Sequence, residues 1–362
     1  MNPTQAFAEL GQSLWLDDIS KPLLDDGRLD RYIGELNVTG LTSNPAIFQA
    51  AIGSSDAYDS AIAHLRSTGS DGEALLFDLM LDDLQRAADL FKEVHSRTSG
   101  VDGYVSLEVS PLLARDTAAT VAQAEDIHNR ADRSNLFVKI PGTPEGLPAI
   151  EESIFKGVPV NVTLLFDDIQ FRAANNAVKR GLERRVVAGL SPDVASVASV
   201  FVSRWDKAVH DTVAADMRNR LGVAMMNRVW GSYRHVLADA GWLALINNGA
   251  RPQRLLWAST GTKDPAAPET LYVDELAAPL TVNTMPEKTL LATAESGRPL
   301  PRLDVDAAEA ELARFSYAGV DVVALGKTLQ DEGVVLFEDA WRSVLGTLAD
   351  KAGLLDTESA AT

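Results

Sequence analysis

One lysine and two carboxylates in this chain have the residue types and positions that carbonyl chemistry requires. Lys139 lies between Val138 and Ile140 in an apolar run, Glu108 ends a second run, and Asp17 follows a third. A desolvated lysine favours the neutral amine, which can attack a carbonyl, while nearby carboxylates can move the protons. Each residue has a structural alternative. Lys139 fits an edge-strand or snorkelling lysine, Glu108 a salt-bridge partner, and Asp17 a turn residue.

Further polar residues interrupt or follow the same kind of apolar run: Asp18, Asn44, Asn161, Thr163, Ser199 and Ser259. Asn44 precedes Pro45, so an Asx turn is its structural alternative. In a parallel barrel the carboxyl ends of all strands converge on one mouth, where active sites lie. We therefore expect these side chains to face one another although they are far apart in sequence.

The chain lacks the residues of several other kinds of site. It has no cysteine, and its five histidines lie in helix-like segments, none of them at the end of a predicted strand. We therefore expect no metal site. The sequence contains no G-x-S-x-G elbow, no phosphate-binding G-x-x-x-x-G-K and no dinucleotide fingerprint.

Composition limits the partners of the protein. The net charge of −18 opposes nucleic-acid binding but allows a small anion to bind where a few cations share one cleft. No run approaches the roughly 20 apolar residues of a membrane helix, and the N-terminal residues do not resemble a secretory signal. We expect a soluble, cytoplasmic protein with neither nucleic-acid nor membrane partners.

The elements that would position the polar residues alternate along the chain. Short runs rich in Val, Leu and aromatic residues predict buried parallel strands at 13–16, 38–42, 104–108, 136–140, 158–162, 199–202, 254–258 and 280–283. Amphipathic segments predict helices between them, among them 74–97, 117–130 and 167–180. Strands that alternate with helices, eight in number, favour a closed (β/α)₈ barrel over an open sheet.

The chain beyond the eighth predicted strand reads as helical. We assign residues 1–303 to the catalytic barrel and 304–355 to a C-terminal helical extension packed on it. The extension contains predicted helices at 304–315, 320–329 and 334–352. The small polar residues 356–362 are expected to form a frayed tail.

The motifs around these residues, in this order, resemble the transaldolase family from Leu14 to about Ala352. They are Leu14-Trp-Leu-Asp-Asp18, Gly40-Leu-Thr-Ser-Asn-Pro45, Val105-Ser-Leu-Glu-Val109, Asn135-Leu-Phe-Val-Lys-Ile-Pro141, Asn161-Val-Thr-Leu-Leu-Phe166 and Ser199-Val-Phe-Val-Ser-Arg204. The Trp-Leu-Asp-Asp start and Trp257-Ala-Ser-Thr-Gly-Thr-Lys263 are similar to its longer bacterial branch.

The resemblance implies an α/β protein with a TIM barrel of the class I aldolase type, in a monomer or homodimer. It implies an enzyme without a cofactor, acting in the non-oxidative pentose phosphate pathway. Such an enzyme transfers a dihydroxyacetone unit from sedoheptulose 7-phosphate or fructose 6-phosphate to glyceraldehyde 3-phosphate or erythrose 4-phosphate.

The resemblance also implies a role for each matching residue. Lys139 matches the lysine that forms the Schiff base, and Asp17 the acid/base at the bond being cleaved. Glu108 matches a carboxylate that works through a water held by Thr163. The remaining matches are Asn44 and Asn161, which orient the hydroxyls of the fragment, and Ser199 and Arg204, which bind phosphate.

The chain departs from the family pattern after the seventh predicted strand. Many relatives carry an arginine two residues after the serine that corresponds to Ser259, whereas this chain has Gly261. We expect Lys263 to supply the second cation, as a point charge rather than a bidentate fork.

Two alternatives remain. Fructose-6-phosphate aldolases of the same superfamily release the fragment, but they tend to be shorter, with glutamine in place of Glu108 and tyrosine near Phe201. The other alternative is a catalytically silent barrel that serves as a binding or scaffold protein. Such a barrel would be expected to lack Lys139, Asp17 or Glu108, and all three are present.

Overall fold

Eight parallel strands form a closed barrel at the centre of the molecule. The computed structural model describes residues 3–299 and 303–360. The strands pair in sequence order, and β1 closes the barrel against β8. They are β1 (Ser13–Leu16), β2 (Val38–Thr42), β3 (Tyr104–Glu108), β4 (Leu136–Pro141), β5 (Val160–Leu165), β6 (Ser196–Phe201), β7 (Arg254–Ala258) and β8 (Thr281–Met285). The predicted (β/α)₈ TIM barrel is therefore confirmed.

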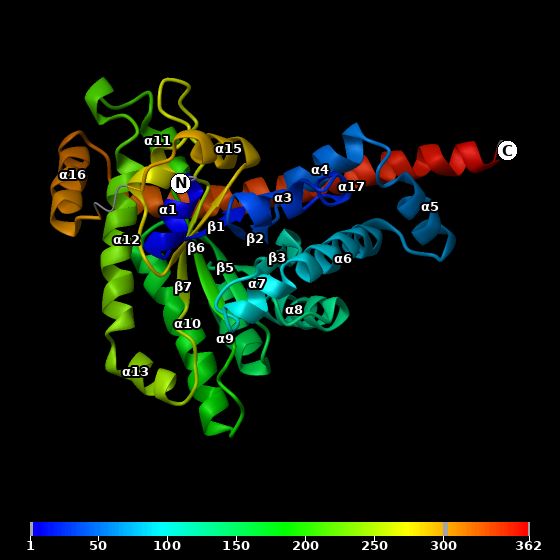
Figure 1. The fold of residues 1–362 in the computed structure, drawn as a ribbon, viewed down its shortest axis with the longest axis horizontal. Coiled ribbons are helices and arrows are strands. Elements are labelled where there is room, and N and C mark those ends of the chain that lie inside the picture. Colours follow the sequence, from blue (N-terminus) through cyan, green and yellow to red (C-terminus); the bar gives the residue numbers. More distant parts are fainter. Residues whose placement is uncertain (1–2, 300–302, 361–362) are drawn as a thin grey trace.

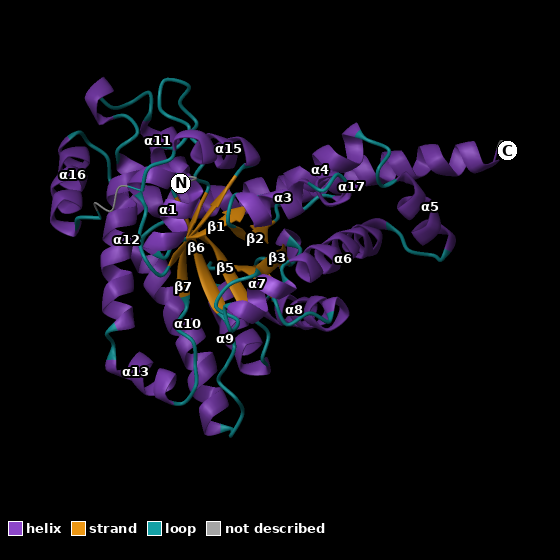
Figure 2. Cartoon of the chain, viewed as in Figure 1, coloured by secondary structure: helices purple, strands orange, loops and turns teal. Residues whose placement is uncertain are grey.

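Helices surround the strands (Figures 1 and 2). They are α1 (Pro3–Leu10), α2 (Lys21–Asp25), α3 (Arg28–Glu35), α4 (Pro45–Ser54), α5 (Asp59–Ser67), α6 (Gly72–Leu90), α7 (Lys92–Arg97), α8 (Thr117–Ala131), α9 (Gly146–Lys156), α10 (Asp168–Val187), α11 (Ser203–Val209), α12 (Leu221–Leu237), α13 (Ala240–Asn247), α14 (Leu271–Glu275), α15 (Glu287–Ser296), α16 (Val305–Tyr317) and α17 (Val322–Ala360), with 3₁₀ turns at Pro111–Leu113 and Ala215–Met217. None of the described helices is long and apolar enough to cross a membrane.

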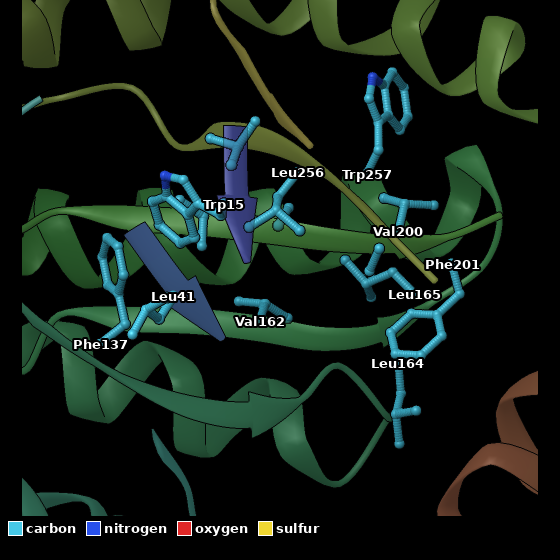
Figure 3. Packing of buried hydrophobic residues seen from close by; sticks show 14 of the residues in the cluster. Trp15, Leu41, Phe137, Val162, Leu164, Leu165, Val200, Phe201, Leu256 and Trp257 are labelled. Atoms are coloured by element: carbon cyan, nitrogen blue, oxygen red, sulfur yellow. The ribbon is translucent and has the colours of Figure 1, made fainter. Parts of the chain in front are cut away.

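Apolar side chains fill the barrel because its strands are covered on both faces. Every residue of β3, β5, β6 and β8 is buried. Trp15 and Phe137 lie at one end of the packed core, whereas Leu164 and Phe201 lie at the other (Figure 3). The second end is where the strands finish, so its packing supports the mouth of the barrel.

Four strands differ in extent from the sequence prediction, β4 and β8 by one or two residues and β5 and β6 by more. β5 begins at Val160 rather than at residue 158, because Pro159 has no N–H to donate to a neighbouring strand. It then continues past residue 162 to Leu165, which places Thr163 inside the strand. β6 begins at Ser196, whose buried hydroxyl donates to the carbonyl of Val160 at 2.8 Å, and ends at Phe201.

Four predicted helices were also wrong in extent, and one of them, 167–180, continues to Val187 in α10. The predicted helix 74–97 is divided at Phe91 into α6 and α7. Conversely, the predicted helices 320–329 and 334–352 form one continuous helix, α17, of 39 residues. Gly333 lies in the gap between the two predicted helices. Because glycine has no side chain, α17 can pack closely against the barrel at this point. A Cβ at this position would lie 3.1 Å from Leu164.

Helix α17 crosses the mouth of the barrel and continues along α4, α5 and α6 (Figure 1). Side chains fix it at several points along its length. The Trp341 indole donates to Glu73 at 2.6 Å, and the Lys351 ammonium lies 2.6 Å from the Asp59 carboxylate. The helix continues through Ala360, and residues 361 and 362 of the expected frayed tail lie outside the described residues.

We predict that the close packing of α17 depends on Gly326. A methyl group there would lie 2.8 Å from Asp167 Oδ2 and 3.2 Å from the Trp205 ring. Overpacking of this kind costs about 1–3 kcal/mol, more than the helix propensity that alanine adds. Gly326→Ala should therefore lower the free energy of unfolding, measured by denaturant titration.

The matched control is Gly346→Ala in the same helix, where an added Cβ has no neighbour within 4 Å. It should raise the free energy of unfolding by roughly 0.5–1 kcal/mol. Equal effects of the two substitutions would show that Gly326 is not a packing contact.

Candidate active site

The strand register places three predicted site residues at one level of the barrel. Glu108 on β3 is opposite Lys139 on β4, and Lys139 is opposite Asn161 on β5. Residues in register on adjacent parallel strands present their side chains to the same face. The sheet therefore brings the lysine, the carboxylate and the amide together without help from any loop.

Lys139 is buried, with 5% of its surface exposed. Its ammonium donates to the backbone carbonyl of Ser43 at 2.7 Å and lies 5.9 Å from the centre of the Phe337 ring. The amine thus has one fixed hydrogen bond, and an aromatic ring of α17 covers it from outside the barrel. The alternative of an edge-strand lysine is excluded, since the closed barrel has no edge.

Glu108 is buried beside this lysine. Burial raises the pKa of Glu108 to about 7, an effect that Lys139 opposes and Asp17 reinforces. The carboxylate oxygen Oε1 and the Thr163 hydroxyl are buried without a hydrogen-bond partner in the described chain. Both residues line a cavity of about 10 Å³, which is the scale of one water molecule.

Asp17 is held at the mouth by two neighbours from the next strand. The Thr42 hydroxyl donates to Asp17 Oδ1 at 2.9 Å, and the Asn44 amide donates to Oδ2 at 3.4 Å. Asn44 also caps α4, because its Oδ1 accepts from the Ile47 N–H at 3.3 Å. The expected Asx-type bond is present, and it orients the amide toward the catalytic carboxylate candidate.

Asn161 is fully buried and lies below the mouth. Its amide donates to the Ser106 hydroxyl at 3.2 Å, and its Oδ1 accepts from the Ser199 hydroxyl at 2.7 Å. Asp18, Asn161 and Glu108 do not line the main cavity, whereas all the other predicted site residues do. Ser106, Asn161 and Ser199 thus form a hydrogen-bonded row that supports the floor of the site.

The main cavity has a volume of about 470 Å³, within the usual range for small-molecule sites. The predicted residues that line it are Asp17, Asn44, Lys139, Thr163, Ser199, Phe201, Arg204, Ser259 and Lys263. Ser259 has a positive φ of 57° and shares a hydrogen bond of 2.9 Å with the Ser203 hydroxyl. Gly261 also lines the cavity, so the position that departs from the family pattern is part of the site.

Three cations face this cavity: Arg204, Lys207 and Lys263. None of them has a hydrogen bond or ion pair within residues 3–299 and 303–360, although most other arginines of this acidic chain are ion-paired. Burial lowers the pKa of Arg204, an effect that Glu332 opposes. Unpaired cations at the rim of a cavity form a binding site for an anion such as phosphate.

Sequence reasoning missed Lys207 and the residues of α17 that line the cavity, Leu336, Phe337 and Ala340. Lys207 could have been found, since it lies three residues after Arg204 and therefore on the same face of a helix. The α17 residues carried no local signal, because only the tertiary packing of α17 brings them to the mouth. Among the described residues there is no group of His, Cys, Asp or Glu that could hold a metal ion.

Comparisons with known proteins identify the family of the chain. Residues 14–348 match the family described as Transaldolase/Fructose-6-phosphate aldolase. The chain is 44% identical to a transaldolase of Thiobacillus denitrificans over 358 residues, covering 96% of this chain and 100% of that protein. It is 43% identical to a transaldolase of Thermobifida fusca, covering 97% of this chain and 98% of that protein. The chain therefore belongs to the transaldolase/fructose-6-phosphate aldolase family of enzymes.

Proposed function

We propose that the protein transfers a dihydroxyacetone unit between sugar phosphates through a Schiff base on Lys139. The observation that carries this proposal is the buried Lys139 amine, which opens onto a cavity whose rim holds three unpaired cations. The donor is sedoheptulose 7-phosphate or fructose 6-phosphate, and the acceptor is glyceraldehyde 3-phosphate or erythrose 4-phosphate. This is the transaldolase step of the non-oxidative pentose phosphate pathway, which we place in the cytoplasm.

The reaction begins with attack of the Lys139 amine on the ketose carbonyl. The carbonyl oxygen leaves as water after it has gained two protons, and a protonated imine remains. Glu108 is suited to relay these protons, because a carboxyl group with a pKa near 7 can both donate and accept at neutral pH. The water that it shares with Thr163 would extend its reach to the amine.

The protonated imine then accepts the electrons of the carbon–carbon bond. Asp17 removes the proton of the adjacent hydroxyl, the bond breaks, and an aldose phosphate leaves. An enamine stays bound to Lys139 and attacks the carbonyl carbon of the acceptor aldehyde. Hydrolysis of the new imine releases the product ketose, so the transfer is of the ping-pong type.

The alternative within the family is an aldolase that releases the fragment. Phe201 lines the cavity and has no proton to give, whereas a tyrosine would place a hydroxyl near the enamine. The Glu108 carboxylate lines the small cavity and not the main one, whereas Thr163 lines both. Both residues favour transfer over release.

We predict that the fragment is bound to Lys139 and is transferred. With fructose 6-phosphate and erythrose 4-phosphate, the protein should form sedoheptulose 7-phosphate and glyceraldehyde 3-phosphate. With fructose 6-phosphate alone it should accumulate an adduct that borohydride reduces and peptide mapping locates at Lys139. Lys139→Ala and Lys139→Arg should be inactive, because arginine is too basic to act as the amine.

Two results would contradict this assignment. An adduct on Lys156 or Lys263 would show that Lys139 is not the nucleophile. Release of dihydroxyacetone as fast as transfer would identify an aldolase.

We predict that Arg204 binds the phosphate group of the substrate. A lost charge-assisted hydrogen bond costs about 1.5–3 kcal/mol, so Arg204→Ala should raise KM for fructose 6-phosphate by roughly 10- to 100-fold. The KM for unphosphorylated fructose should change little, since fructose has no group for Arg204 to hold. Steady-state kinetics with both substrates measure the difference, and an equal loss for both would refute the role.

We predict that the rate of adduct formation rises as pH increases through about 7. Burial raises the pKa of Glu108 to about 7, so its carboxylate, the form that accepts protons, predominates only above that pH. Single-turnover measurements should show this rise in the wild type. Glu108→Gln should remove it and slow adduct formation by roughly 10²- to 10⁴-fold. A rise that persists in the glutamine variant would assign it to another group.

A further inference from the structure

Two side chains border both the main cavity and the small cavity beside Glu108. Among the residues that line these cavities in the described chain, Thr163 and Phe337 are the only ones common to both. Thr163 belongs to β5, whereas Phe337 comes from α17, far along the chain. The walls of the two spaces therefore have one small polar side chain and one aromatic ring in common.

The position of the Phe337 ring is fixed by the helix that carries it. Two turns earlier in α17, the Gln330 amide donates to the carbonyls of Leu164 at 2.9 Å and Gly142 at 3.2 Å. One turn earlier, Val334 lines the small cavity and Gly333 packs closely against Leu164. These contacts attach α17 to the ends of β4 and β5, the two strands that carry Lys139 and Thr163.

The ring also covers the amine. The Lys139 ammonium lies 5.9 Å from the centre of the Phe337 ring, and Lys139 lines the main cavity but not the small one. Glu108 lines the small cavity but not the main one. A water that moves from the small cavity to a fragment bound in the main cavity would therefore cross the wall that Thr163 and Phe337 share.

The proposed reaction needs this separation because water has opposite effects at two stages. Imine formation and hydrolysis require water beside Glu108. The enamine instead requires that water stay away from its nucleophilic carbon. Protonation of that carbon gives an iminium ion, water then adds to the iminium carbon with loss of a proton, and the Lys139 amine leaves as dihydroxyacetone forms. This leak consumes one water and loses the fragment.

We propose that Phe337 is a positioning residue that confines water to the Glu108 side of the site and so sets the ratio of transfer to loss of the fragment. The inference rests on the proposed function, since it concerns the intermediate on Lys139. It assigns to α17 a direct part in the outcome of the reaction.

The test compares Phe337→Ala, Phe337→Leu and a control, Val335→Ala. Val335 is in the same helix, is about half exposed and lines neither cavity. Each protein is given fructose 6-phosphate with and without erythrose 4-phosphate, and free dihydroxyacetone is measured against sedoheptulose 7-phosphate. Phe337→Ala should raise the ratio of release to transfer at least about tenfold, equivalent to about 1.4 kcal/mol. Phe337→Leu should restore most of the wild-type ratio, and Val335→Ala should match the wild type.

Hydrogen exchange along α17 separates the effect of the ring from undocking of the helix. Exchange as slow as in the wild type, together with the raised ratio, supports the inference. An unchanged ratio in Phe337→Ala, with the Lys139 adduct still formed, overturns it and leaves the proposed function intact. A ratio that rises only when the whole helix exchanges faster also overturns it. Failure of the wild type to form any adduct on Lys139 would instead refute the proposed function and the inference together.

Discussion

The burial of Lys139 beside Glu108 is the constraint on which the rest of the site depends. Burying a charged group is costly, and these two residues lie in register on neighbouring strands, where the lysine opposes the effect of burial on the pKa of the carboxyl group. Burial favours the neutral form of Glu108 and the lysine favours the charged form, which together leave its pKa at about 7.

The second requirement is a cover that keeps this pair out of bulk water. The strands alone leave the mouth of the barrel open, and α17 closes part of it with Leu336, Phe337 and Ala340. Two glycines allow the helix to approach closely, Gly326 near Trp205 and Gly333 near Leu164. The C-terminal helix is thus as much a part of the site as the strands, although it contributes no catalytic candidate.

Much of the barrel could be predicted from the sequence, because short apolar runs alternate with amphipathic segments, and the site was predicted from the joint pattern of polar residues in and after those runs. The β3 and β7 boundaries, for example, agree with the predicted ranges. The position of α17 could not be predicted. The sequence predicted two helices with a gap at residues 330–333, whereas the reason for Gly333 in that gap, its close contact with Leu164, lies in another element. The extension of β5 was missed for a related reason. Near its end, Leu164 has a positive φ, and the Gln330 amide of α17 donates a hydrogen bond to the Leu164 carbonyl.

The hydrogen bond between the Lys139 ammonium and the Ser43 carbonyl has a stereochemical consequence. One N–H direction of the amine is occupied by that bond, and Phe337 covers a second side. The planar enamine of the proposed reaction would then be open to an acceptor on only one of its two faces. Bond formation on a single face fixes the handedness of the new centre at the enamine carbon. The walls around one lysine would therefore determine one of the two new centres of the product sugar, and the orientation of the acceptor aldehyde would determine the other.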